Sequence, residues 1–204
     1  MDKEIRMFNF EVRAEDTDRG HTITGRPIVF GQMTDLGWYD EVIERGALDE
    51  TDLKDVRLLV NHNVDMIPLA RSRNNTENST MRLMPDENGL GIRADLDTEN
   101  NADAKSLFSA VSRGDIDGMS FMFTVEKDSW DDPDSEHPTR HILSIRRVFE
   151  VSAVNFPAYS RTSIQARGLS DALDSAKESL ESERKRLHEL ERRKKRIKLL
   201  TEVL

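Results

Sequence analysis

Short runs of alternating apolar and polar residues fill the body of the chain, and a period of two is typical of β-strands. Many short strands at this spacing favour a closed barrel or a sandwich, so we predict a mainly β fold with flanking helices. The polar segment Asn74–Thr80 is predicted to join two of the strands as a hairpin, and the last strand is expected to close a barrel. The predicted strands are Phe8–Val12, Ile23–Phe30, Ile67–Arg73, Met81–Met84, Gly89–Leu96 and Ile142–Phe149.

One helix interrupts the strands, and its start and end are both marked in the sequence. Asn101 is a suitable N-cap, and Gly114 is suited to end the helix. Its apolar stripe consists of Ala104, Leu107, Phe108 and Val111. A strand then begins at Ser120, which shares one face with Met122, and a polar loop over Asp128–His141 leads to the last predicted strand.

From Ser170 onward the apolar period changes to that of a helix. Leucine and other apolar residues recur in steps of three and four, as in a coiled coil, with polar residues at some seam positions. The seam residues are Leu173, Ala176, Leu180, Leu187, Leu190, Ile197 and Leu204. We predict a β-barrel domain over 1–168 and a separable helical extension over 169–204, which pairs through Leu173–Leu204 with a partner helix or with its own copy. The alternative is a single solvated helix.

Composition and charge narrow the possible partners. The chain has 204 residues, of which 36% are hydrophobic, and no cysteine, which excludes disulfides, a thiol nucleophile and a thiolate metal site. The start of the sequence lacks the apolar run of a signal peptide, and no segment is apolar over the length needed to span a bilayer, so we expect no membrane association.

The net charge of −9 is concentrated in the body, because residues 170–204 carry ten Lys and Arg against eight Asp and Glu. An acidic body argues against nucleic acid as a partner. The basic run Arg192–Arg196 lies beside Glu189 and Glu191 and has no interleaved aromatics, so an exposed or partner-binding helix face is favoured there.

Three side chains beside strand-like runs offer a base, a nucleophile and an acid: His62, Ser120 and Glu150. A hydroxyl is a poor nucleophile at neutral pH, so it needs an imidazole to take its proton and a third group to orient that imidazole. The order of such residues along the chain differs among unrelated hydrolases, so the fold must bring them together.

A second cluster, His137 and His141 among acidic residues, superficially resembles a metal site. Pro133 and Pro138 break any helix that would align the two histidines. We therefore interpret this segment as a solvated loop and expect neither a metal ion nor a cofactor.

Several ordered motifs together resemble the prohead maturation serine proteases of tailed phages, over most of residues 8–167. The segments that carry the resemblance are Ile23–Gly25, Val29–Phe30, Leu36–Ile43, Gly46–Leu48, Leu59–His62, Gly114–Phe121, Glu150–Val154 and Pro157–Tyr159. The resemblance implies an assemblin-like closed β-barrel, as in the related herpesvirus proteases. It also implies a serine endopeptidase that cuts the major capsid protein precursor and scaffold inside the assembling prohead in the host cytoplasm.

Carried over to this sequence, the family's catalytic histidine and serine match His62 and Ser120. The third position matches Glu150, with His137 and His141 as alternatives in the preceding loop. Assemblins stabilise the oxyanion with an arginine-containing turn after the third position, which points to Arg161, and the rival pair is Arg146 and Arg147. A different function remains open at this point, that of a non-catalytic capsid assembly or scaffolding protein acting through its coiled-coil tail.

Overall fold

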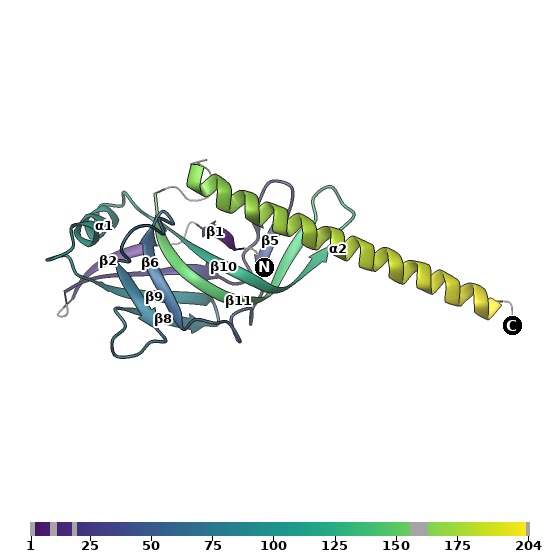
Figure 1. The fold of residues 1–204 in the computed structure, drawn as a ribbon, viewed down its shortest axis with the longest axis horizontal. Helices are drawn as coiled ribbons and strands as arrows, with labels where there is room; N and C mark the ends of the chain where they lie inside the picture. The colour runs from purple at the N-terminus through teal and green to yellow at the C-terminus, as the bar shows by residue number, and fades with distance from the viewer. Residues whose placement is uncertain (1–2, 9–11, 18–19, 156–162, 203–204) are drawn as a thin grey trace.

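Two β-sheets, a short helix and one long helix make up the structure (Figure 1). The computed structural model describes residues 3–8, 12–17, 20–155 and 163–202. Its strands are β1 (Glu4–Phe8), β2 (Val12–Thr17), β3 (Gly20–Val29), β4 (Thr34–Asp35), β5 (Asp40–Ile43), β6 (Asp55–Val60), β7 (Ala70–Arg73), β8 (Met81–Asp86), β9 (Gly89–Leu96), β10 (Gly118–Asp131) and β11 (Thr139–Val154). The helices are α1 (Ala102–Ser112) and α2 (Ser163–Glu202).

The larger sheet has seven strands and is organised around the long strand β11. Antiparallel β10 lies along one edge of β11, and β1 pairs with the far edge of β10. On its other edge, β11 pairs in parallel with β5 near its start and with β6 near its end. This arrangement places the end of β6 and the start of β10 on opposite sides of the same stretch of β11.

The smaller sheet has the order β2-β3-β9-β8, and within the described residues hydrogen bonding does not close the two sheets into a barrel. The closed-barrel prediction is therefore not confirmed, although the mainly β class is. The predicted hairpin around 74–80 is wrong, because β7 pairs with β6 while β8 pairs with β9. The segment instead crosses between the sheets, where the Thr80 N–H donates to the Arg71 carbonyl at 3.0 Å.

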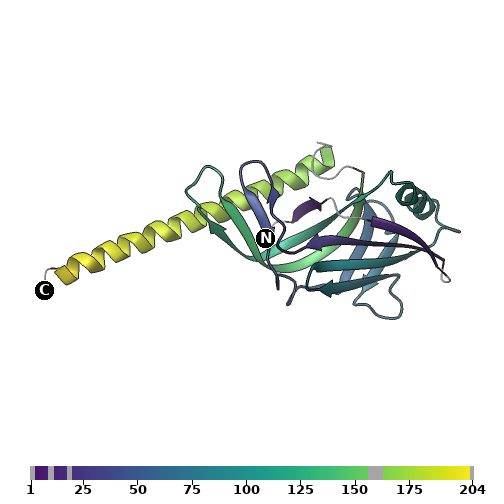
Figure 2. The same ribbon diagram turned by 180° about the vertical axis from the view of Figure 1, so that it is seen from behind.

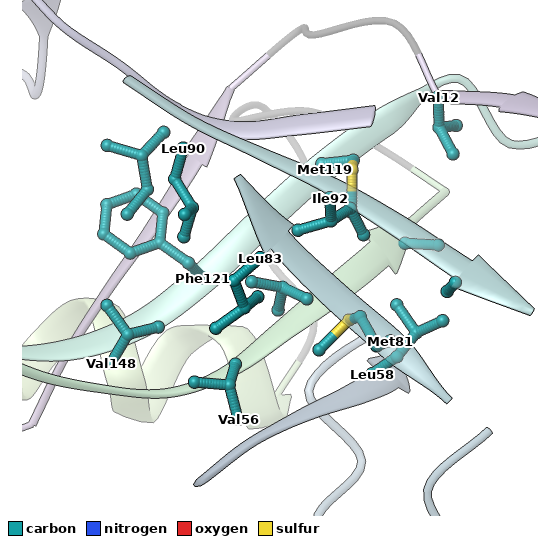
Figure 3. Packing of buried hydrophobic residues seen from close by; sticks show 14 of the residues in the cluster. Val12, Val56, Leu58, Met81, Leu83, Leu90, Ile92, Met119, Phe121 and Val148 are labelled. Atoms are coloured by element: carbon teal, nitrogen blue, oxygen red, sulfur yellow. The ribbon is translucent and has the colours of Figure 1, made fainter. Parts of the chain in front are cut away.

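The main core lies between the two sheets (Figure 3). Strand alternation sends one face of each strand inward, which is why the apolar residues of the sequence pattern meet there. The fully buried members include Ile23, Ile92, Met119, Phe121 and Val148. Because Phe121 faces the core, its neighbour Ser120 on β10 faces the other side of the sheet.

Helix α1 agrees with the sequence prediction in its cap, stripe and end. The Asn101 side chain accepts hydrogen bonds from the N–H groups of Asp103 and Ala104, and Gly114 adopts a φ of 75° just past the helix. The buried residues of the helix are Ala104, Leu107 and Val111. The loop predicted over 128–141 is much shorter in the structure, because β10 continues to Asp131 and β11 begins at Thr139, so the two strands pair almost to their tips.

Helix α2 packs its first half against the body and extends its second half away from it (Figures 1 and 2). Ala176 and Leu180 are buried against Tyr39 and Trp130, and the Trp130 indole donates to the Ser179 hydroxyl at 3.1 Å. Part of the predicted coiled-coil seam, at Ala176 and Leu180, is thus covered by the body of the same chain. Farther along, Leu190 and Ile197 are 39% and 53% exposed. No helix within the described ranges is both long and apolar enough to cross a membrane.

A buried cluster of charges fastens β1 to its neighbours. Arg6 Nη2 lies 2.6 Å from Glu4 Oε2 and 2.6 Å from Glu41 Oε2, and Arg140 Nη1 lies 2.9 Å from Glu4 Oε2. These four side chains are at most 3% exposed. Burial alone raises the pKa of the Glu4 carboxyl, but the nearby Arg6 and Arg140 guanidinium groups outweigh it and hold that pKa below its ordinary value.

We expect Glu4→Gln to destabilise the protein by about 3 kcal/mol at neutral pH, because it leaves buried arginine charge uncompensated. A depressed carboxyl pKa contributes stability above the unfolded value, about 4, and loses it as pH falls through the folded value. The difference in Tm between wild type and variant should therefore become smaller as the pH falls from about 5 to about 2, and nearly all of it should be lost over that range.

Thermal melts followed by circular dichroism across that range measure the effect. The control is Asp86→Asn, since Asp86 pairs with Arg26 in a position where its side chain is 41% exposed, and it should change Tm less at every pH. A Tm difference for Glu4→Gln that stays constant from neutral to acid pH would contradict the assigned pKa direction.

Candidate active site

The backbone turns sharply at the end of β6 and brings His62 back over β11. Asn61 and His62 have φ values of 51° and 56°, a left-handed conformation that Asn and His tolerate better than most residues. The Asn61 N–H donates to the Ala153 carbonyl at 3.0 Å, which continues the parallel pairing of β6 with β11 into the turn. The turn thus directs the imidazole across β11 toward β10.

Ser120 and Glu150 reach the same imidazole from neighbouring strands. His62 Nε2 lies 2.6 Å from Ser120 Oγ, and His62 Nδ1 lies 2.6 Å from Glu150 Oε1. Strand register explains the meeting, because Ser120 is paired with Ser152 and Glu150 with Met122, so all four side chains lie on one face of the β10–β11 pair. The three residues predicted from the sequence therefore form one hydrogen-bonded chain.

Ser152 is a fourth member of this chain that sequence reasoning missed. Its hydroxyl donates to Glu150 Oε2 at 2.6 Å and accepts from the His62 N–H at 3.1 Å. It is fully buried, so both of its partners depend on it for these hydrogen bonds. The signal was present in the sequence, since Glu150 and Ser152 are two apart on one strand and must share a face.

The site is closed to solvent in this structure. His62 and Glu150 are each 2% exposed, and Ser120 is completely buried. Strand β1 lies beside Ser120, and the Ser120 hydroxyl donates to the Arg6 carbonyl oxygen at 2.6 Å. Sequence reasoning missed this contact as well, because charged residues at Glu4 and Arg6 suggest a solvated segment and not a buried strand.

The other predicted groups lie elsewhere. His141 Nδ1 is 2.7 Å from Glu44 Oε1, and His137 Nε2 is 3.3 Å from Asp40 Oδ1, so neither alternative to Glu150 contacts His62. Arg147 Nε is 3.6 Å from Asp52 Oδ2 on a half-buried side chain, and Arg146 Nε is 3.8 Å from Glu126 Oε2 on an exposed one. The oxyanion residue proposed from the resemblance, Arg161, lies outside the described residues.

One group of side chains has the spacing of metal ligands. Asp35, Asp40 and His137 place one ligand atom each within 4.8 Å of one another, near the tip of the β10–β11 pair. Asp35 and His137 are exposed, and exposed acidic groups of this kind are common without an ion. The group does not include the residues around Ser120.

Comparison with known proteins identifies the family of this chain. Residues 8–176 match the family described as caudovirus prohead serine protease. The chain belongs to the caudovirus prohead serine protease family. A 97-residue stretch is 32% identical to the prohead protease of Enterobacteria phage HK97 and covers 47% of this chain and 41% of that protein. No solved structure gives a significant match.

The prohead protease match spans the three residues of the hydrogen-bonded chain. His62, Ser120 and Glu150 all fall within the matched range of 8–176, as does the buried Ala176 of α2. The resemblance seen in the sequence motifs is thereby confirmed at the level of the family. The match begins at the last residue of β1 and ends within α2.

Proposed function

We propose that this chain is a serine endopeptidase that cleaves the scaffold, the major capsid protein precursor or both inside the phage prohead, within the host cytoplasm. The observation that carries the proposal is the hydrogen-bonded chain from Ser120 through His62 to Glu150. His62 Nε2 is 2.6 Å from Ser120 Oγ, and His62 Nδ1 is 2.6 Å from Glu150 Oε1. Membership of the prohead serine protease family supports the same reaction class. A purely scaffolding protein has no need for this buried polar chain.

In the first half of the reaction, His62 Nε2 takes the proton of Ser120 as Oγ attacks the carbonyl carbon of the scissile peptide bond. The resulting tetrahedral intermediate collapses when His62 gives that proton to the leaving amine, which breaks the C–N bond and leaves an acyl-enzyme on Ser120. In the second half, His62 takes a proton from water as the water oxygen attacks the ester carbon, and it returns that proton to Ser120 Oγ as the C–O bond breaks and the acid product leaves. The distance between Nε2 and Oγ already allows direct proton transfer.

Glu150 accepts a hydrogen bond from Nδ1–H, which fixes the tautomer that leaves Nε2 free to act as a base. Its carboxylate also stabilises the imidazolium that forms during each half-reaction. Ser152 holds the other carboxylate oxygen and the His62 backbone, so acid and base keep a fixed relation. Arg161 remains our candidate for the oxyanion donor, as an inference from the family resemblance.

The exposed half of α2 supports a role in delivery to the assembling shell. Apolar residues there continue the three-and-four spacing, and those with described side chains include Leu187, Leu190 and Ile197. An amphipathic helix that protrudes from the body is suited to pair with helical scaffold or with a second copy of the same helix. We therefore propose helical scaffold or a second copy of this helix as the partner, and we place the pairing surface on the part of α2 that extends beyond the body.

A fluorophosphonate probe tests the proposed function directly. We expect the full chain to become covalently labelled on the peptide that contains Ser120, as shown by intact mass and peptide mapping after prolonged incubation. Ser120→Ala should remove the label, whereas Ser106→Ala, which alters an exposed serine on α1, should not. Absence of label on a folded wild-type chain would exclude the serine protease and favour the scaffolding alternative.

Replacing Ser152 with alanine should lower the rate of capsid precursor cleavage by about tenfold, because removing one partner of a buried charged hydrogen bond costs roughly 1.5 kcal/mol. The change falls on kcat, since the hydrogen bonds of the Ser152 hydroxyl go to Glu150 and the His62 backbone. Ser144→Ala on the same strand is the control. A rate equal to that of wild type would show that Ser152 does not position the acid and the base.

A further inference from the structure

Strand β1 occupies the edge of β10 that carries Ser120. The two strands pair antiparallel, with Met7 opposite Ser120, Arg6 opposite Phe121 and Ile5 opposite Met122. β1 is the terminal strand of its sheet, and among the described strands it pairs with β10 alone (Figure 1). An extended polypeptide commonly binds to an enzyme or module by adding a strand to such an edge.

The contact with Arg6 also competes for the proton on which the reaction depends. Ser120 Oγ is 2.6 Å from the Arg6 carbonyl oxygen and 2.6 Å from His62 Nε2. A serine hydroxyl has one hydrogen, so it donates to one of these acceptors at a time. While the hydrogen points to the Arg6 carbonyl, His62 is not aligned to remove it, and the nucleophile is not activated.

Strand β1 is held only by noncovalent contacts, namely ion pairs and strand hydrogen bonds, so it can leave its place without a covalent bond being broken. Its buried charges are held by Glu41 of β5 and Arg140 of β11, and the Ser175 hydroxyl of α2 donates to Glu4 Oε1 at 3.1 Å. Arg6 and Glu4 alternate with Ile5, so Ile5 faces the same side of the sheet as Ser120. Ile5 is 8% exposed.

We propose that the β10 edge beside Ser120 is the binding site for the extended polypeptide substrate and that β1 is its resident occupant, which keeps the enzyme inactive until it is displaced. The inference rests on the proposed protease function. Displacement is an exchange of one strand for another at the same edge, without a covalent step. The substrate strand would place its scissile carbonyl carbon beside Ser120 Oγ, with the carbonyl oxygen turned away from the hydroxyl, and so leave the Ser120 proton to His62.

A disulfide between Ile5→Cys and Met122→Cys locks β1 in place and tests the proposal. Directly opposed residues of antiparallel strands have Cα atoms about 4.5–5.5 Å apart, within the range that a disulfide bridges. The natural chain has no cysteine, so no other disulfide can form. Intact mass before and after dithiothreitol identifies the locked and unlocked forms.

We expect the locked form to react with the fluorophosphonate at least about tenfold more slowly than the reduced form, and to cleave the capsid precursor more slowly by the same factor. A tenfold difference corresponds to about 1.4 kcal/mol of free energy. The single variants Ile5→Cys and Met122→Cys should not respond to dithiothreitol. Equal rates in the locked and reduced forms would overturn the proposal. If the reduced form is folded but reacts with neither reagent, the protease function itself is wrong, and this inference is wrong with it.

A loosening variant tests the same proposal from the opposite direction and does not depend on disulfide formation. Ile5→Asp places a charge on the buried face of β1 without altering Glu4 or Arg6, and should raise the labelling rate of Ser120 several-fold. Met33→Asp, at a position that is 60% exposed, is the matched control and should leave the rate unchanged. A labelling rate for Ile5→Asp at or below that of wild type, in a chain that still melts cooperatively, would overturn the proposal.

Discussion

Replacing Ser120 with alanine is expected to lower the rate of capsid precursor cleavage by about 10⁶-fold, because the group that forms the covalent intermediate is gone. His62→Ala should have a similar effect, and the double variant should be no worse than either single one, since the two side chains act as a unit. Glu150→Gln should reduce the rate by about 10⁴-fold, because the amide favours the wrong tautomer of the imidazole.

Cleavage is measured by co-expressing each variant with the capsid precursor and following both chains by intact mass. Ser120 donates to the Arg6 carbonyl, so its removal also frees that carbonyl, and thermal melts must show that the variant remains folded. The control is Ser106→Ala, which removes an exposed serine on α1 and should cleave the precursor at the wild-type rate. Full cleavage by Ser120→Ala would end the serine protease hypothesis, whatever the outcome at His62.

Truncation should divide α2 into a part that the body needs and a part that it does not. A chain that ends at Arg167 loses Ala176 and Leu180, which exposes Tyr39 and Trp130. Uncovering a large apolar side chain costs about 1.5–3 kcal/mol, so the total loss is roughly 5 kcal/mol and approaches the whole stability of a small domain. We expect this chain to melt far below the wild type or not to fold.

A chain that ends at Lys185 keeps the packing of Leu180 and the 2.6 Å hydrogen bond from Arg184 to the Pro133 carbonyl. It should therefore fold, react with the fluorophosphonate and yet fail to enter proheads. Charged replacements at Leu187 and Leu190 in the full chain should reproduce this separation. Packaging of the chain ending at Lys185 at the normal level would show that the exposed half of α2 has no role in delivery, and stable folding of the chain ending at Arg167 would contradict the packing role of α2.

Local chemistry explains which elements the sequence predicted well. Helix α1 was located from an N-cap, a stripe and a glycine, all of which act within a few residues. The loop at 128–141 and the hairpin at 74–80 were misjudged, because strand length and strand partner depend on what lies beside them in space. Ala176 and Leu180 of the predicted coiled-coil seam pack against the body, whereas the pairing of the rest of the seam stays a prediction, because periodicity does not say whether a partner chain or the chain's own body covers an apolar face.

By itself the sequence determined the mainly β class, the helix α1 and the long C-terminal helix, and it nominated His62, Ser120 and Glu150 as candidate site residues, because strand period, caps and the motif segments are properties of neighbouring residues. Only the tertiary structure decided that these three side chains meet, since their 2.6 Å contacts depend on β10, β11 and β6 lying side by side and on the left-handed turn at His62. It also decided the contacts of Ser152 and of β1 with this site. A serine in a strand and a charged N-terminal segment make such contacts only when residues distant in sequence bury them, and burial is a property of the whole fold.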